Sequence, residues 1–459
     1  MSDYVIVGAG TAGCVLAAGL SASGAEVTLL ESGPPDRRPE VRIPAAFPRL
    51  FGTEYDWAHT TEPQPGLGGR SLFWPRGRTL GGSSSINAQI WTQGHPDDYD
   101  DWATPGWSAK EVAPCFERAA MNLESLRTPH PSTIDFLDAC ELAGLTPLVA
   151  GEGCAPVTVT QKRGRRWSSA DAYLRPAGSR PNLKVITGAD VRRIDLADGR
   201  AVGVEYGDGY VPARREVIVA AGAVGSPVLL LRSGIGDPAE NEGVVVALPE
   251  VGRNLLDHLM VPLVFGPGPA AARVRATSNN AEALAFLRSA PEVSAPDLEF
   301  LWMPVPFLDH GRAESGLGST LAVVLLRPRS SGRITLTAGE PRIDPGYLTD
   351  PADLRPLLAG VRRAHGLLTR LTDWVGEPLT PAARTTSAEA VRESAETLYH
   401  PVGTCRMGPV VDERLRVRGV RDLRVADVSV CPAIPRAHTQ AAAVMIGERA
   451  VDLILKEPR

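Results

Sequence analysis

Three glycines and one acid near the N-terminus have the spacing of a dinucleotide-binding motif. Gly8, Gly10 and Gly13 follow a short apolar strand, and Glu31 lies at the end of the next expected strand. Gly8 permits a tight turn, Gly10 lets the backbone approach a pyrophosphate, and Gly13 lets helix and sheet pack closely. The helix N-terminus then presents its N–H groups to the phosphates. Glu31 can accept a hydrogen bond from a ribose hydroxyl and disfavours the 2′-phosphate of NADP, so NAD and FAD remain.

A second block, residues 75–88, is suited to binding an anion. It contains the pair Gly81-Gly82 followed by three serines that begin at Ser83. The glycines allow close backbone approach, and the serines supply hydroxyl and amide donors. The alternative is a flexible turn of glycine and serine.

Asp427 ends a third candidate segment, a strand expected at residues 423–427. From a strand end its carboxylate can be aimed at a ribityl chain or a pyrophosphate. The alternative is a solvated acid with no ligand.

Two of the eight histidines are candidates for proton transfer, because an imidazole with a pKa of about 6.5 suits a general base near neutral pH. His400 precedes a Pro-Val-Gly turn, and His438 lies in a polar Ala-His-Thr-Gln loop before a helix. The alternative for either is a hydrogen-bonded structural residue. We interpret His95 and His258 as structural loop residues. No two histidines have the spacing of zinc ligands and the cysteines do not join them, so no metal site is expected.

Composition narrows the class of protein that positions these residues. The chain has 459 residues, enough for about two or three domains. Its net charge of −5 gives no reason to expect nucleic acid as a partner. No apolar run approaches the roughly 20 residues of a transmembrane helix, and the N-terminus has no export signal. Six scattered cysteines form no disulfide framework, so we expect a cytoplasmic protein.

Hydrophobic patterning predicts an α/β fold with a second, antiparallel sheet. The short strands expected after the first βαβ unit form a strand-rich insertion at residues 183–186, 191–196, 202–206 and 216–220. Further strands are expected at 298–303, 321–326 and 333–337, in a sheet that walls a substrate pocket. Helices are expected at 351–371, 387–393 and 441–455. Arginines at 163, 165, 166 and 406 are interpreted as surface residues, and the alternative is that they bind an anionic substrate.

Four blocks together resemble the glucose–methanol–choline (GMC) oxidoreductase family of FAD enzymes. They are residues 5–31, residues 75–87 with 94–99, residues 222–236, and residues 400–407 with 435–440. The resemblance implies a Rossmann-like FAD-binding domain and a substrate domain built on an antiparallel sheet flanked by helices. It divides the chain into 1–98, 184–262 and 400–459 for FAD, and 99–183 and 263–399 for substrate.

The resemblance also implies which residues contact FAD. The ADP half is assigned to the first motif, with Val191 near the adenine. The pyrophosphate or isoalloxazine is assigned to the second block, and Asp427 and Gln440 flank the flavin from the C-terminal side. The residues implied in these roles are Gly8, Gly10, Gly13, Glu31, Arg78, Gly82, Ser83, Asn87, Ala88, Val191, Asp427 and Gln440. Ile86 stands where some members carry a histidine bound covalently to FAD, so a dissociable FAD is expected.

The implied reaction is oxidation of a small-molecule alcohol to a carbonyl by hydride transfer to flavin N5. His400 is the expected general base and His438 the residue that orients the substrate oxygen. O₂, a quinone or another carrier is the expected electron acceptor. The alternatives are a hydroxynitrile lyase-type enzyme without net redox chemistry and a non-catalytic flavin-binding protein. Short actinobacterial members that resemble the mycofactocin-associated dehydrogenase are one specific possibility. The chain is shorter than usual members, mainly around 120–160 and 260–345, so the substrate is left open.

Overall fold

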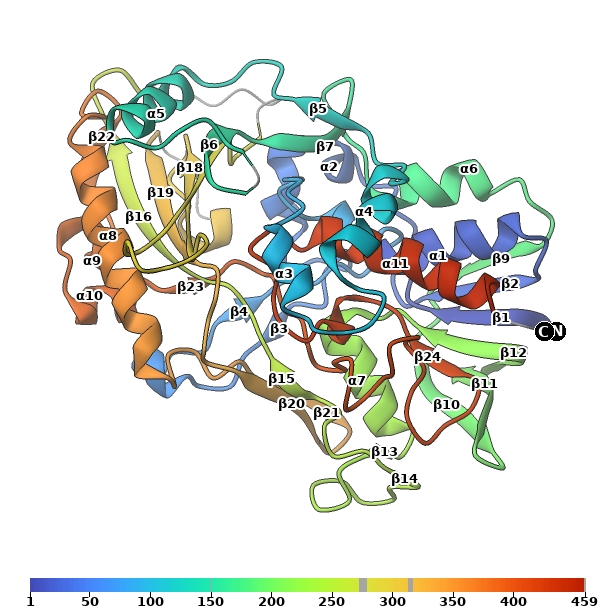
Figure 1. Ribbon diagram of the computed structural model, residues 1–459. Coiled ribbons are helices and arrows are strands. Elements are labelled where there is room, and N and C mark those ends of the chain that lie inside the picture. Colours follow the sequence, from blue (N-terminus) through green and yellow to red (C-terminus); the bar gives the residue numbers. More distant parts are fainter. Residues whose placement is uncertain (150, 272–278, 313–316, 458–459) are drawn as a thin grey trace.

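The computed structural model describes residues 1–149, 151–271, 279–312 and 317–457. Two large sheets lie side by side, one toward each end of the molecule, and both chain termini lie beside the sheet that contains β1 (Figure 1).

The first sheet has seven strands, five of them parallel in the order β24-β12-β1-β2-β9. Strands β10 and β11 extend it in antiparallel fashion from β12. The middle strands are almost continuously apolar because both of their faces are covered. The bounds are β1 Ser2–Val7, β2 Val27–Glu31, β9 Leu183–Thr187, β10 Val191–Ala197, β11 Arg200–Tyr206, β12 Gly209–Val219 and β24 Leu423–Val425.

The expected strand-rich insertion at residues 183–220 is corrected by this pairing. Strand β9 pairs in parallel with β2, and β12 pairs in parallel with β1, so both are integral strands of the nucleotide-side sheet. Only β10 and β11 form an added antiparallel pair. The alternation of side chains identifies a strand but carries no information about its partner.

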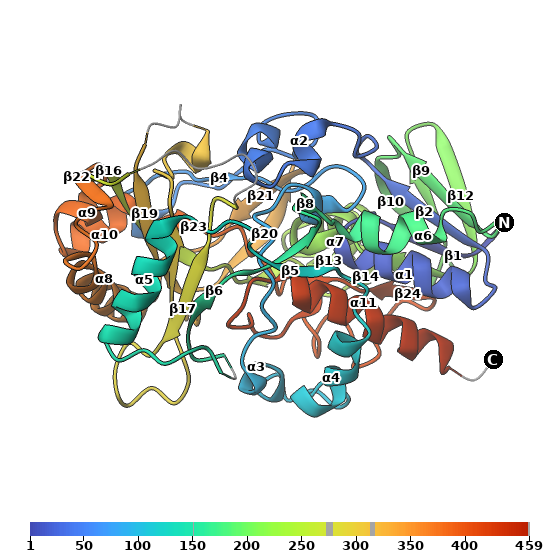
Figure 2. The same cartoon turned by 90° about the horizontal axis from the view of Figure 1, so that it is seen from above.

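Two helices from opposite ends of the chain pack together over one face of this sheet (Figure 2). They are α1 (Thr11–Ala22) and α11 (Gln440–Leu455). Small residues bring them close: a Cβ atom on Gly447 would lie 2.8 Å from the Cβ of Val15. This contact places the C-terminal loop that precedes α11 beside the first glycine motif.

The second sheet is antiparallel, in the order β22-β16-β19-β18-β17-β6, with β23 paired to β16. Both of its faces are apolar. One face packs beneath helices α5 (Pro131–Leu142) and α8 (Leu354–Leu368), and the other faces the first sheet (Figure 1). The bounds are β6 Gly153–Pro156, β16 Leu259–Pro267, β17 Ala283–Leu287, β18 Leu298–Met303, β19 Ser319–Leu325, β22 Val375–Pro378 and β23 Glu396–Thr397.

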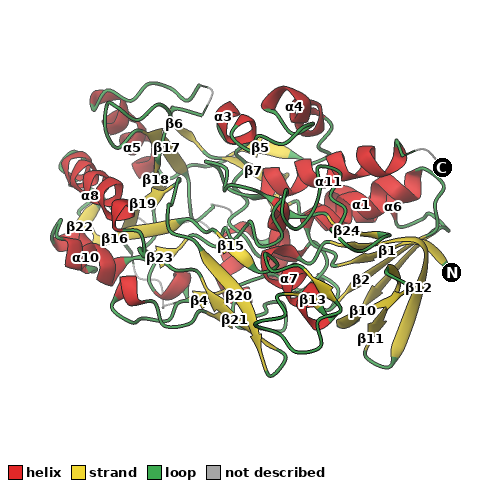
Figure 3. Ribbon diagram, turned by 60° about the horizontal axis from the view of Figure 1, so that its bottom comes forward, coloured by secondary structure: helices red, strands yellow, loops and turns green. Residues whose placement is uncertain are grey.

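Smaller elements connect the two sheets. A three-stranded sheet of β15 (Arg253–Leu255), β20 (Gly332–Thr337) and β21 (Glu340–Asp344) lies between them (Figure 3). The remaining strands are β3 His59–Thr60, β4 Phe73–Trp74, β5 Leu123–Ser125, β7 Thr158–Lys162, β8 Arg165–Arg166, β13 Ile235–Gly236 and β14 Val246–Ala247. The remaining helices are α2 Pro39–Arg42, α3 Pro96–Asp100, α4 Ala109–Glu117, α6 Arg175–Ala177, α7 Gly222–Arg232, α9 Pro381–Arg384 and α10 Ala388–Ser394.

Two of the expected domain boundaries, after residues 98 and 262, fall inside elements of the fold. The boundary at residue 262 falls inside β16, which pairs along its length with β19 of the antiparallel sheet. Helix α4, placed in the expected substrate domain, packs against α11, and Trp102 and Trp107 are buried in the same core as α11. Among the described residues, no helix is both long enough and apolar enough to cross a bilayer.

Arg424 on β24 supplies a test of how this edge of the first sheet is held. Its side chain is 1% exposed and donates two hydrogen bonds to Glu216 of β12, at 2.6 and 2.9 Å, while Nη2 lies 2.7 Å from Glu457. We expect Arg424→Met to lower the free energy of unfolding by about 3–5 kcal/mol, because Glu216 loses its partner and Glu457 loses one of its arginines.

Urea unfolding followed by tryptophan fluorescence measures this change. Arg200→Met is the matched control, because Arg200 pairs with Asp422 on the surface and such pairs contribute about 1 kcal/mol or less. Equal unfolding midpoints for the two variants would contradict the conclusion that the buried ion pairs of Arg424 stabilise this edge of the sheet.

Candidate functional site

A cavity of about 480 Å³ lies between the two sheets and is lined by residues from both ends of the chain. Nearly all of the residues expected to contact FAD or substrate line this cavity. These are Gly8, Gly10, Glu31, Gly82, Ser83, Asn87, Ala88, Val191, Asp427, Gln440, His400 and His438. Gly13 and Arg78 do not line it.

The first glycine motif closes one end of the cavity. A Cβ atom on Gly8 would lie 2.6 Å from the carbonyl oxygen of Ala220, and one on Gly13 would lie 1.9 Å from that of Gly8. Gly13 therefore acts in packing, as expected, and not through the cavity surface. Helix α1 begins after Gly10 without a side-chain cap, so N–H groups of its first turn are left for an anionic ligand.

Glu31 is held at the end of β2 by two backbone donors. Its carboxylate accepts hydrogen bonds from the N–H groups of Ala9 and Gly33, each at 2.9 Å. Burial raises the pKa of Glu31 to about 7, although these bonds and Arg78 favour the charged form. The second lone pairs of both oxygens remain for ribose hydroxyls.

The second block meets the first motif by direct backbone contact. Gly82 has a φ of +54°, and a Cβ there would lie 2.7 Å from the Cα of Gly10. The N–H of Gly81 donates to the carbonyl oxygen of Ala9 at 2.8 Å. The two anion-binding candidates therefore form one continuous surface. Arg78 points elsewhere, with its guanidinium carbon 5.0 Å from the ring centroid of Trp57.

Asn87 is fixed by a fully buried arginine. Arg166 donates from Nη1 to Asn87 Oδ1 at 2.8 Å and from Nη2 to the Asn87 carbonyl at 2.6 Å, and its other bonds go to the carbonyls of Ser84 and Val41. The interpretation of Arg166 as a surface residue is therefore wrong. Asn87 in turn donates to Gln440 Oε1 at 2.7 Å.

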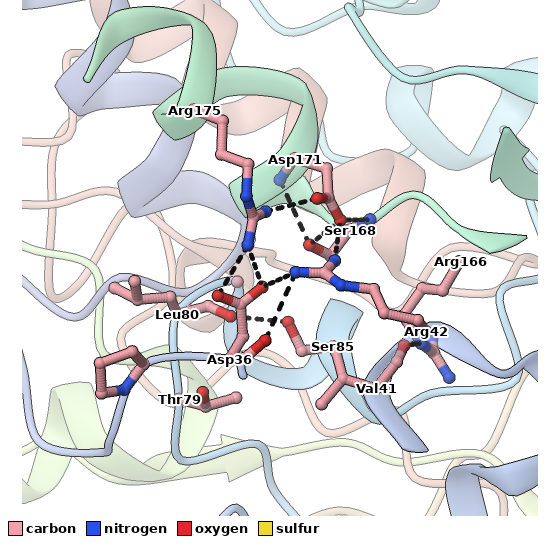
Figure 4. Close-up of polar contacts among 12 residues, drawn as sticks. Asp36, Val41, Arg42, Thr79, Leu80, Ser85, Arg166, Ser168, Asp171 and Arg175 are labelled. Atoms are coloured by element: carbon pink, nitrogen blue, oxygen red, sulfur yellow. Dashed lines mark hydrogen bonds and ion pairs between the residues drawn. The ribbon is translucent and has the colours of Figure 1, made fainter. Parts of the chain in front are cut away.

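An ion-pair cluster braces the segment that carries Arg166. Asp36 and Asp171 each accept hydrogen bonds from both Arg42 and Arg175, and Asp171 also accepts one from Ser168 (Figure 4). These residues come from the loop after β2 and from the segment after β8. The cluster fixes both segments around the second block.

Asp427 lies at the cavity, but its carboxylate already has protein partners. Oδ2 accepts hydrogen bonds from the Gly222 N–H at 2.8 Å and the Ser226 hydroxyl at 2.6 Å, and Oδ1 accepts one from the Ser429 N–H at 2.8 Å. Asp427 therefore joins β24 to the start of α7 as well as lining the cavity.

His400 and His438 come together at the other end of the cavity. Their ring centroids are 4.8 Å apart, and their planes meet at 79°. His400 Nε2 and His438 Nδ1 bond no described residue. Burial lowers the pKa of His400 well below 6.5, and His438, His258 and Arg76 lower it further. His400 is therefore neutral near neutral pH.

A third histidine decides which nitrogen of His400 carries the proton. His258 Nε2 lies 3.2 Å from the carbonyl oxygen of Leu326, so Nε2 must be the protonated nitrogen. Burial lowers the pKa of His258 to about 3, so its Nδ1 is an unprotonated acceptor. His258 Nδ1 lies 3.0 Å from His400 Nδ1, which therefore donates. His400 Nε2 is left with a free lone pair.

His438 is paired with a buried carboxylate. Its Nε2 lies 2.9 Å from Oε1 of Glu299, which has no exposed surface. Glu299 therefore holds the His438 imidazole from the side of Nε2.

The backbone of His400 is held separately. Asp257 Oδ1 accepts a hydrogen bond from the His400 N–H at 2.6 Å, and Oδ2 accepts bonds from Tyr347 and Thr397. Burial raises the pKa of Asp257 to about 6 despite these bonds.

Sequence reasoning missed three supporting residues. His258, which the sequence indicates as a structural loop residue, bonds the expected base directly. Glu299 was not considered, yet an acid inside the apolar strand Leu298–Met303 was a signal, because unpaired acids are rarely buried. No pattern in the neighbouring sequence indicates that Arg166 is buried and bonds Asn87, because its partners are distant in the sequence.

The cavity fits a dinucleotide with a flavin. Gln440 Nε2 is buried with no partner among the described residues, and a flavin carbonyl would accept its hydrogen bond. The glycine surface and the first turn of α1 suit a pyrophosphate, and Glu31 suits a ribose. Across the described residues, no cluster of three or more histidine, cysteine or acidic side chains is arranged to hold a metal.

Comparison with known proteins agrees with this geometry. Family models described as GMC oxidoreductase match residues 2–260 and 328–447. An uncharacterised GMC-type oxidoreductase of Mycobacterium tuberculosis is 43% identical over 99% of both chains. An alcohol dehydrogenase [acceptor] of Pseudomonas putida is 38% identical over 100% of this chain and 96% of its own.

Comparison with solved structures supports the fold. The crystal structure of pyridoxine 4-oxidase from Mesorbium loti superposes with a TM-score of 0.92 over 100% of both chains, at 29% identity. The expected fold class is therefore confirmed. The chain belongs to the GMC oxidoreductase family of FAD-dependent flavoproteins.

Proposed function

We propose that this protein oxidises the CH–OH group of an alcohol to a carbonyl, with His400 as the general base. Membership of a family of oxidoreductases that includes an alcohol dehydrogenase supports the reaction class. The observation that carries the assignment of the base is the hydrogen bond from His400 Nδ1 to His258, which leaves Nε2 free. Bound FAD supplies the hydride acceptor.

The two histidines divide the work at the hydroxyl group. His400 Nε2 accepts the hydroxyl proton, and its lowered pKa keeps it unprotonated near neutral pH. His438 hydrogen-bonds the same oxygen and orients it, with Glu299 holding the imidazole. Asp257 fixes the His400 backbone, so that the acceptor does not move away as the proton is transferred.

We further propose that FAD is bound without a covalent link. Ile86 lines the cavity at the position expected for a covalently bound histidine, and it carries no nucleophile. Retention of FAD then depends on noncovalent contacts, among them those of Asn87 and Gln440.

Replacing the base should slow the reaction without releasing the cofactor. We expect His400→Ala to lower kcat by about 10²–10⁴-fold while FAD stays bound. Anaerobic bleaching of the flavin absorbance by an alcohol measures the rate. His365→Ala, on α8 far from the cavity, is the control and should react at the parent rate.

If His400→Ala reduced the flavin at the same rate as the parent protein, His400 would not be the general base. Aldehyde release without flavin bleaching in the parent protein would instead indicate a lyase and remove the proposed reaction.

The pH dependence follows from the lowered pKa of His400. The base works unprotonated, so kcat/KM is lost as pH falls through its pKa. Because burial lowers that pKa well below 6.5, we expect kcat/KM to stay level from about pH 8 down to about pH 6.5. A single protonation that halves kcat/KM above pH 7 would contradict the neutral, buried imidazole.

Arg166 provides the test of cofactor retention. Arg166→Met removes the four donors that fix Asn87, Ser84 and Val41, so we expect FAD to be lost on dialysis at least about tenfold faster than from the parent. Arg165→Met is the matched control, because the neighbouring Arg165 is exposed. Retention of FAD by both variants would show that Asn87 does not need this support.

A further inference from the structure

We infer that the substrate is an uncharged alcohol with an apolar chain. The inference rests on the proposed alcohol oxidation, and it adds the chemical class of the substrate.

The wall of the cavity opposite the dinucleotide motifs is apolar. Strand β18 alternates: Leu301 and Met303 line the cavity, and Phe300 and Trp302 pack into the core under α8. Met260 of β16 joins them on the same face of the sheet. Phe47 and Phe51, from the loop after α2, line the cavity as well.

No carboxylate of a described residue lines this wall of the cavity. Asp257 and Glu299, which bond the two histidines, do not line the cavity. Four acidic residues among those described do line the cavity, and each has a partner within the protein. None of them belongs to the second seven-stranded sheet; they are Glu31, Asp190, Glu340 and Asp427. An ammonium group buried against this wall would therefore have no carboxylate from the described residues in direct contact with it.

The charged residue Arg76 lines the cavity and is bonded to the residue that precedes His400. Its Nη2 donates to the carbonyl oxygen of Tyr399 at 2.6 Å, and its Nε donates to that of Pro75. Its positive charge adds repulsion against a cation. Since its bonds are made to backbone carbonyls, Arg76 serves to hold the segment before His400.

Three polar side chains that line this part of the cavity each make a hydrogen bond within the protein. Gln89 donates to the carbonyl oxygen of Pro44, and Asn280 donates to that of Ala45. The Tyr399 hydroxyl lies 2.7 Å from His310 Nδ1. Few groups are left to bind the additional hydroxyls of a sugar, so apolar contact provides most of the binding.

Matched alcohols test the inference with the FAD-loaded enzyme. Choline and 3,3-dimethyl-1-butanol have the same shape, but only choline carries a charge. We expect kcat/KM for the neutral compound to exceed that for choline by at least about 100-fold. Among 1-butanol, 1-pentanol and 1-hexanol, kcat/KM should rise about threefold or more with each added methylene. The anion 5-hydroxypentanoate should react more slowly than 1-pentanol.

Binding is measured without turnover. The tertiary alcohol 2-methyl-2-heptanol has no hydrogen on its carbinol carbon, so it cannot be oxidised. It should perturb the flavin absorbance at lower concentration than tert-butanol does. Met303→Gln should weaken this binding, and the volume-conserving Met303→Leu should retain it.

The outcomes separate the two proposals. Faster oxidation of choline, of 5-hydroxypentanoate or of glucose would overturn the apolar class and leave alcohol oxidation in place. Failure of every alcohol to reduce a bound flavin would overturn the proposed function itself.

Discussion

The hydrogen bond between His258 and His400 determines the chemistry of the site. It joins two Nδ1 atoms, so one must donate and the other must accept. The carbonyl oxygen of Leu326 fixes the proton of His258 on the far nitrogen, and this leaves His400 as the donor. Because His400 donates through Nδ1, its Nε2 keeps an unshared lone pair that faces no donor of a described residue. Without it, either nitrogen of His400 could carry the proton.

This arrangement depends on the antiparallel sheet. His258 immediately precedes β16, Leu326 immediately follows β19, and Glu299 lies on β18, so three neighbouring strands carry the partners of both histidines. The histidines themselves come from C-terminal loops that α11 holds beside α1. The nucleotide-side sheet and the antiparallel sheet therefore contribute to one site, and neither is sufficient alone.

The sequence predicted those parts of the molecule that depend on local patterns. The strand at 298–303 is observed with the same bounds, and the strands and helices expected elsewhere lie close to those found. The glycine motifs could be recognised because their spacing in the sequence is short and fixed. At Gly8 and Gly13 a side chain would collide with backbone atoms. Similarity to known proteins confirms the expected family and its use of FAD.

Long-range pairing could not be predicted in the same way. The partners of β9 and β12 lie far away in sequence, which is why an insertion was expected in their place. The bonds from Arg166 to Asn87, from Glu299 to His438 and from His258 to His400 each join distant segments. Such contacts exist only after the sheets have assembled, and residue type alone does not reveal them.

The protonation state of His400 is the most direct test of the account. With only eight histidines in the chain, ¹⁵N-labelled imidazoles of the FAD-loaded enzyme can be resolved by NMR and assigned by substitution. We expect His400 near neutral pH to show a protonated Nδ1 and an unprotonated Nε2, and His258 to show the reverse. A proton on His400 Nε2 at that pH would contradict its assignment as the base.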